Sequence, residues 1–134
     1  AIPPAATPLA TARMNLVAKS VWMAAPASDV YVCENPSVLI AAADQLGSSS
    51  RPLVCTNGRP SAAALRLLSG LAEGGTSIHV RADDDSAGQA IVMTVRRAIP
   101  SARLWRFEAR PPGRPRYEEQ DLPLLLRDLH RGSA

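Results

Sequence analysis

Acidic side chains follow two short apolar runs in this sequence, at positions suited to binding a cation. Asp83, Asp84 and Asp85 follow the run 77–80 after two intervening residues, and Glu34 comes directly after the run "DVYVC". Adjacent side chains diverge, so Asp83 and Asp85 can face one ion while Asp84 points elsewhere. Two like charges about 4 Å apart repel by roughly 4 kcal/mol at an effective dielectric of 20, and a hard divalent cation offsets this. We therefore predict that Glu34, Asp83 and Asp85 bind Mg²⁺ or Mn²⁺.

Simpler interpretations compete with this one at several residues. Asp84 is better explained as a solvated turn residue, and Asp85 could cap the helix that follows, a role compatible with metal binding. The turn at Asn57, followed by Arg59, is either a strand-to-helix connection or a loop that positions a phosphate group. His79 lies in the middle of an apolar run, where we expect it to pack rather than to catalyse.

The elements that must position these residues alternate along the chain. Apolar runs predict strands, and segments with Pro near the start and Gly near the end predict helices. The expected strands are 29–33, 51–55, 77–80 and 102–107, and the expected helices are 36–47, 59–75, 86–99 and 117–131, the last with a break near Pro123. This order predicts an α/β fold, with a mainly parallel four-stranded sheet and helices on both faces. Functional residues then lie beyond the carboxyl ends of the strands, where Glu34 and the aspartates converge if their strands are neighbours.

The remaining segments give the domain organisation. We expect an N-terminal extension over residues 1–28, with a helix over 8–24, and one α/β domain over 29–134. The chain lacks an initiator Met, so we expect either a processed chain or part of a longer protein. Cys33 and Cys55 lie in strand-like runs, which fits buried residues in a reducing cytoplasm better than a disulfide framework. No apolar run has the roughly 20 residues needed to cross a membrane.

The net charge of +3 is weak evidence for a partner, but its distribution is informative. Lys19 is the only lysine, and seven arginines crowd residues 96–116 in the last third of the chain: Arg96, Arg97, Arg103, Arg106, Arg110, Arg114 and Arg116. They could hold a phosphate backbone, or they could be solvated side chains of an arginine-rich composition. The predicted phosphate and DNA contacts are Asn57, Arg59, Arg81 and Arg106.

Glu34 at the end of one strand, followed by Asp83, Asp85, Ala87 and Gly88 in "DDDSAG" at the end of a later strand, resembles the Toprim domain. That domain occurs in bacterial primases, topoisomerases, recombination-mediator proteins and small nucleases. The resemblance implies a Toprim-like three-layer sandwich in which the carboxylates bind Mg²⁺ for phosphodiester cleavage.

A closer resemblance covers nearly all of residues 29–130. The segments "VYVCENPSVLIAAADQLG", "PLVCTNGRPSAAALRLLSGLAEGG" and "YEEQDLPLLLRDL" are similar to the C-terminal domain of JetD-type subunits, the condensin-associated proteins of Wadjet plasmid defence. Two departures stand out: Asp84 replaces an aromatic residue of that family, and Arg81-Ala82 replaces its His-Gly. The resemblance implies a DNA nuclease whose partners are DNA and condensin-like subunits, with a homodimer as a further expected assembly.

Two other functions compete with the nuclease. A Toprim-like module could bind DNA or partner subunits without catalysis. A phosphoryl-transfer enzyme with an aspartyl nucleophile ranks well below both, because Glu34 stands where that Asp would be and the sequence offers no suitable lysine.

Overall fold

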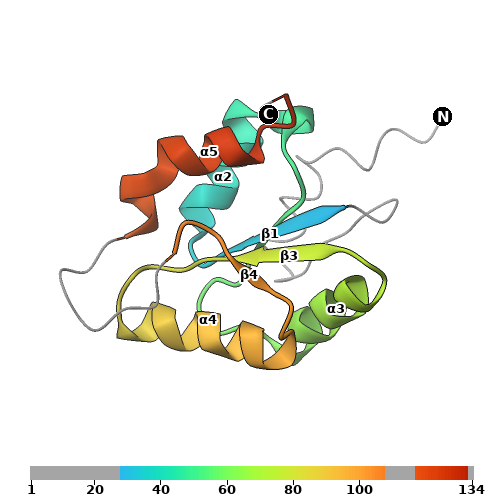
Figure 1. Cartoon of the computed structure of the whole chain (residues 1–134). Coiled ribbons are helices and arrows are strands. Elements are labelled where there is room, and N and C mark those ends of the chain that lie inside the picture. Colours follow the sequence, from blue (N-terminus) through green and yellow to red (C-terminus); the bar gives the residue numbers. More distant parts are fainter. Residues whose placement is uncertain (1–27, 108–116, 133–134) are drawn as a thin grey trace.

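The computed structural model describes residues 28–107 and 117–132 of the chain (Figure 1). Its strands are β1 (Asp29–Cys33), β2 (Leu53–Cys55), β3 (Ser77–Val80) and β4 (Arg103–Leu104). Its α-helices are α2 (Pro36–Gln45), α3 (Ala62–Glu73), α4 (Ser86–Ala98) and α5 (Leu122–Leu129), with short 3₁₀ turns η1 (Gly47–Ser49) and η2 (Glu118–Asp121). The helix predicted over 8–24 lies outside the described residues.

The four strands form one parallel sheet in the order β2-β1-β3-β4. Helices α2 and α5 cover one face and α3 and α4 the other, as Figure 1 shows. The predicted α/β class, with a parallel four-stranded sheet and helices on both faces, is therefore confirmed. Strands β1 and β3 are neighbours, with Val32 paired to Val80 in the register, so the residues that follow the two strands emerge side by side.

Alternation along the strands produces two separate apolar cores, since successive side chains point to opposite faces. Val30, Val32 and Val80 pack with residues of α3 and α4 in one core. Cys33 and Cys55 pack with residues of α2 and α5 in the other. Both cysteines are free thiols and fully buried, which confirms the prediction that they are buried residues rather than a disulfide framework.

Several element boundaries differ from the predicted ones for local reasons. Helix α3 begins at Ala62 rather than at residue 59, because the Ser61 side chain caps it by accepting a hydrogen bond from the Ala64 amide at 3.1 Å. Strand β4 is only two residues long, because Arg106 takes a positive φ of 45° and turns the chain away. The predicted helix over 117–131 is divided into η2 and α5, with Pro123 in the first turn of α5, where proline is well tolerated.

The helices are also short by the standard of membrane proteins. None among residues 28–107 and 117–132 is long and apolar enough to cross a membrane.

Candidate functional site

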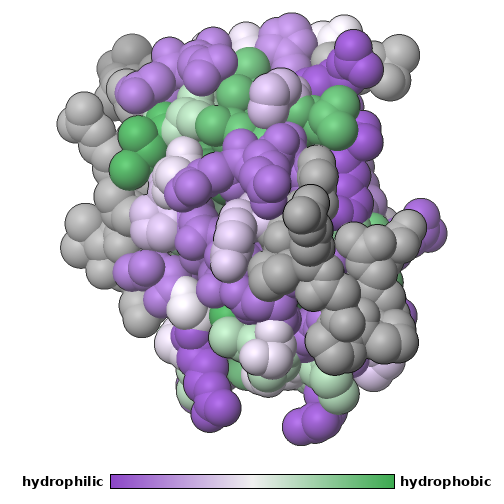
Figure 2. Space-filling view, turned by 90° about the vertical axis from the view of Figure 1, so that its left-hand side faces the viewer, coloured by the Kyte–Doolittle hydropathy of each residue, from purple (hydrophilic) through white to green (hydrophobic). Residues whose placement is uncertain are grey.

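The carboxyl ends of β1 and β3 bring Glu34 and the aspartates together. These two strand ends lie on the left in Figure 1, where α2 and α4 begin. Glu34 Oε1 accepts a hydrogen bond of 2.9 Å from the backbone N–H of Asp83, so the two strand ends are joined directly. Figure 2 views the molecule from this side and shows a mainly hydrophilic surface across its middle. The predicted convergence of residues from two strands is thus present.

Asp83 is fixed by neighbours from two other segments. Its Oδ1 accepts a hydrogen bond of 2.9 Å from Asn35 Nδ2 and one of 2.7 Å from the backbone N–H of Glu118. Asn35 follows Glu34 in the sequence, whereas Glu118 belongs to η2 near the C-terminus. Asp83 therefore connects the ends of β1 and β3 to the last helical segment.

Asp85 and Gly88 shape the turn into α4. Asp85 is the N-cap residue, and its Oδ1 accepts a hydrogen bond of 2.7 Å from the Gly88 amide, which is the capping role considered from the sequence. A Cβ atom at position 88 would overlap the carbonyl oxygen of Asp83, so only glycine fits there. Asp84 accepts a long hydrogen bond of 3.4 Å from Gln89 and is half-buried.

The pKa of the Glu34 carboxyl is raised above its ordinary value at this edge. Partial burial is the main cause, because it disfavours the charged form, and the nearby carboxylates of Asp83 and Asp85 add to it. The hydrogen bond from the Asp83 amide opposes the rise. Both aspartates therefore disfavour the charged form of Glu34, and a cation bound among the three carboxylates would favour the ionised form of Glu34.

The donor chemistry of these residues fits a hard divalent cation, since carboxylate oxygens are the ligands that Mg²⁺ and Mn²⁺ prefer. Hydrogen bonds within the described residues involve one oxygen of each group: Oε1 of Glu34, Oδ1 of Asp83 and Oδ1 of Asp85. Over residues 28–107 and 117–132, however, no three His, Cys, Asp or Glu side chains are already grouped as ligands. An ion would have to draw these carboxylates together.

Behind the edge lies a buried carboxylate that sequence reasoning missed, Glu118, whose side chain is fully buried. It accepts hydrogen bonds from the backbone N–H groups of Glu34 (3.1 Å) and Asn35 (2.7 Å) and from Asn35 Nδ2 (2.9 Å). Burial raises its pKa, while these donors and the Arg81 charge oppose the rise. Glu118 thus holds the backbone at the very point where β1 delivers Glu34.

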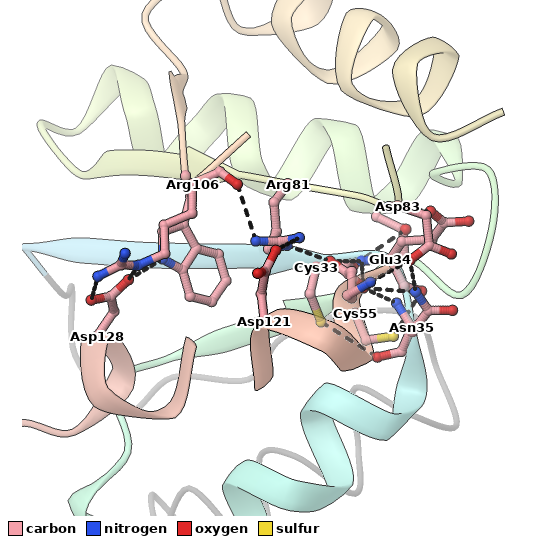
Figure 3. A network of polar contacts seen from close by, with 12 residues as sticks. Cys33, Glu34, Asn35, Cys55, Arg81, Asp83, Arg106, Asp121 and Asp128 are labelled. Atoms are coloured by element: carbon pink, nitrogen blue, oxygen red, sulfur yellow. Dashed lines mark hydrogen bonds and ion pairs between the residues drawn. The ribbon is translucent and has the colours of Figure 1, made fainter. Parts of the chain in front are cut away.

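The position of Arg81 corrects its predicted role as a phosphate or DNA contact. Its side chain is only 2% exposed, and its guanidinium pairs with Glu118 at 3.0 Å and with Asp121 at 3.3 Å. It also donates to the carbonyl oxygen of Arg106 at 3.2 Å. A buried and paired guanidinium cannot reach a phosphate backbone, so Arg81 is a structural cation at the centre of the network drawn in Figure 3.

The other predicted phosphate contacts lie in two separate places. Asn57 and Arg59 are exposed, and the Asn57 backbone N–H donates to the carbonyl oxygen of Glu34 at 3.0 Å, which places this loop beside the carboxylates. Arg106 points the other way, toward Asp128, to which it donates at 2.6 and 3.0 Å. In Figure 3 the Arg106–Asp128 pair lies at the opposite end of the network from Glu34 and Asp83.

One signal could have pointed to Glu118. Two adjacent glutamates in "YEEQDLPLLL" precede an apolar helix, and a helix that packs by its first turn must bury one of the residues at its start. The sequence alone does not say which: Glu118 is buried and its neighbour Glu119 is exposed. The partner of Glu118, Arg81, directly follows strand β3. An arginine is rarely buried at such a position unless an acidic residue pairs with it.

Comparisons with known proteins add the following. The model of a family described as "protein of unknown function C-terminus (DUF2399)" matches residues 11–121. No curated protein matches the chain. Among solved structures, a small TOPRIM domain protein from Bacillus stearothermophilus is 30% identical with a TM-score of 0.46, over 57% of this chain. The chain spans 66% of the length of that protein.

Proposed function

The chain belongs to the DUF2399 family of C-terminal domains, and we propose that its domain is a Mg²⁺- or Mn²⁺-dependent DNA nuclease. The observation that carries the proposal is the meeting of Glu34, from the end of β1, with Asp83, from the end of the adjacent β3. The resemblance of these residues to the Toprim motif supports the same reading. Asp85, two residues further along the chain, adds the third carboxylate.

The electrostatics of the edge support a cation there. Glu34 has a raised pKa because it is partly buried next to two other carboxylates, an arrangement that costs free energy unless a positive charge compensates it. When bound, a divalent ion stabilises the charge that develops on the attacking and leaving oxygens of a phosphodiester. Glu34 could alternatively act as the general base or general acid of the cleavage.

The DNA would approach across the loop that contains Asn57 and Arg59. Both residues are exposed, and the loop is hydrogen-bonded to the Glu34 backbone, so a phosphate held by Arg59 would lie near the carboxylates. Contacts of this kind hold the backbone without reading the base sequence. The finer assignment, a JetD-type subunit of Wadjet plasmid defence in the cytoplasm that assembles with condensin-like subunits or as a homodimer, is supported by sequence resemblance.

Cleavage of supercoiled plasmid DNA in Mg²⁺ or Mn²⁺ tests the proposal. The double variant Asp83→Asn/Asp85→Asn removes both charges but keeps the local fold, because Asn still accepts the hydrogen bonds of Asp83 and is a good N-cap at position 85. We expect it to abolish cleavage, whereas Asp84→Asn should leave cleavage intact. Cleavage by the folded double variant at the rate of the unaltered protein would refute the proposal.

A second candidate is a non-catalytic module that binds DNA or partner subunits. It is favoured by one observation: among the described residues, no set of three potential ligands is already arranged to hold an ion. This candidate predicts that millimolar Mg²⁺ or Mn²⁺ leaves the melting temperature unchanged. A nuclease whose folded state binds the ion is instead stabilised as the metal concentration rises above the dissociation constant.

A further inference from the structure

A second site candidate is a hollow of about 670 Å³ on the face of the sheet that α5 partly covers. It lies between β1, β3, the end of β4 and α5, and its volume is within the usual range for small-molecule sites. Three aromatic side chains, Tyr31, His79 and Trp105, form one part of its lining. Three arginines, Arg51, Arg106 and Arg127, form much of the rest.

The aromatic part of the lining is held rigidly. Tyr31 and His79 are register partners on adjacent parallel strands, and their rings stack with centroids 4.6 Å apart and an interplanar angle of 14°. Trp105 meets Tyr31 edge-on at 4.8 Å. A 2.8 Å contact between His79 Nε2 and Asp29 Oδ1 fixes the orientation of the His79 ring. Trp105 is only 5% exposed, whereas Tyr31 and His79 are half-buried, so a ligand in the hollow meets the rings of Tyr31 and His79 first. Nucleobases stack on immobilised aromatic rings of this kind.

The charged part of the lining favours an anion. The lining contains three arginines and a single acidic residue, Asp128. Asp128 is ionised, because the hydrogen bonds from Arg106 and from Trp105 Nε1 lower its pKa, and it orients the Arg106 guanidinium at one end of the hollow. Arg127 is exposed on α5. Arginine recognises phosphate through paired, charge-assisted hydrogen bonds.

This hollow is separate from the carboxylate edge. The buried cluster of Arg81, Glu118 and Asp121 lies between them, and Figure 3 shows Arg81 and Asp121 midway between Arg106 at one end and Glu34 at the other. The two places therefore bring different chemistry: oxygen donors for a cation at the edge, and aromatic rings with guanidinium groups in the hollow.

We propose that the hollow lined by Tyr31, Trp105 and Arg127 binds a nucleobase that carries a phosphate group. Two sources share this chemistry: a nucleotide within single-stranded DNA and a free nucleotide. Aromatic rings would take the base and the arginines its phosphate. The binding needs no metal ion, so it goes beyond the proposed nuclease activity and stands independently of it.

Fluorescence of Trp105 reports on the site directly. The chain has two tryptophans, and a Trp22→Phe background leaves Trp105 as the only one. Measurements in EDTA, which removes divalent ions, use AMP and a twelve-residue oligo-dT as probes, with inorganic phosphate as the comparison. We expect saturable quenching by at least one nucleotide probe and none by phosphate. Quenching by AMP identifies a free-nucleotide site, and quenching by oligo-dT alone identifies a strand-binding site.

A matched pair of charge reversals tests the location. Arg127→Glu places a negative charge in the lining at an exposed position, and losing a charge-assisted contact worth about 1.5–3 kcal/mol weakens binding by roughly ten- to a hundredfold. Arg66→Glu makes the same change in charge at an exposed position of α3, on the other face of the sheet. Its affinity for the nucleotide probe should stay within about twofold of that of the unaltered protein. No saturable quenching by either nucleotide probe, or equal losses in the two variants, would overturn the proposal.

Discussion

Replacing Glu118 by alanine should strongly destabilise the domain. The substitution removes the acceptor for the backbone N–H groups of Glu34 and Asn35 and one of the two carboxylates that pair with buried Arg81. Arg81 keeps Asp121 at 3.3 Å and the Arg106 carbonyl at 3.2 Å, so its charge is only partly stranded.

The magnitude follows from these losses. Removing one partner of a buried ion pair costs about 3–5 kcal/mol, and the partners that Arg81 retains place the loss near 3 kcal/mol. A domain of this size has a total stability of about 5–15 kcal/mol, so the loss is a large fraction of it. It corresponds to a fall in the melting temperature of roughly 10 °C.

Urea unfolding followed by circular dichroism measures this change. Glu119→Ala is the matched control, because Glu119 is the adjacent glutamate and is exposed; its removal should change stability by less than about 0.5 kcal/mol. If Glu118→Ala does not fold, Glu118→Gln keeps an acceptor oxygen for the Asn35 amide and isolates the loss of charge. Equal unfolding free energies for the alanine variants at 118 and 119 would refute the account of the buried network.

Two further predictions concern the edge itself. Gly88→Ala should destabilise the domain and weaken metal binding, because the added methyl group would overlap the Asp83 carbonyl and displace the turn into α4. Gly70→Ala is the control: Gly70 lies in helix α3 with open space around it, so this variant should stabilise the domain by up to about 1 kcal/mol when both are compared by thermal melting. In metal-free buffer, Glu34→Gln should raise the stability of the domain at pH 7 but not below pH 4.5. Folding raises the pKa of the Glu34 carboxyl, so the domain loses stability as the pH rises above 4.5, the ordinary pKa of that group. Urea titrations at pH 4 and pH 7 check this, and a Gln variant less stable than the parent at pH 7 would contradict the raised pKa.

Much of the fold could be predicted because its signals are local. The strands at 29–33 and 77–80 have the predicted boundaries, since β-branched apolar residues there are bounded by turns. Ser61 and Asp85 cap their helices as residues of those types do. The short β4 was overestimated because its end depends on the positive φ of Arg106, a backbone conformation that an arginine does not signal.

The site could be predicted only in part, and for the same reason. Glu34 and Asp83 follow recognisable strands, and the order of neighbouring strands then brings them together. The burial of Glu118 depends on how η2 packs against the start of α2, a contact between segments far apart in the sequence. The charge of Arg81 suggests a DNA contact when the sequence is read alone. The sequence does not show that Glu118 and Asp121 pair with Arg81 in the interior.

The most direct test of the central claim is isothermal calorimetry of Mn²⁺ binding to the folded chain. We expect saturable binding that Asp83→Asn and Glu34→Gln weaken by at least about tenfold, since each removes a charged oxygen ligand, and that Asp84→Asn leaves unchanged. The affinity should rise with pH as Glu34 loses its proton. No heat of binding at millimolar Mn²⁺, or equal affinities in all three variants, would contradict a metal site at the ends of β1 and β3.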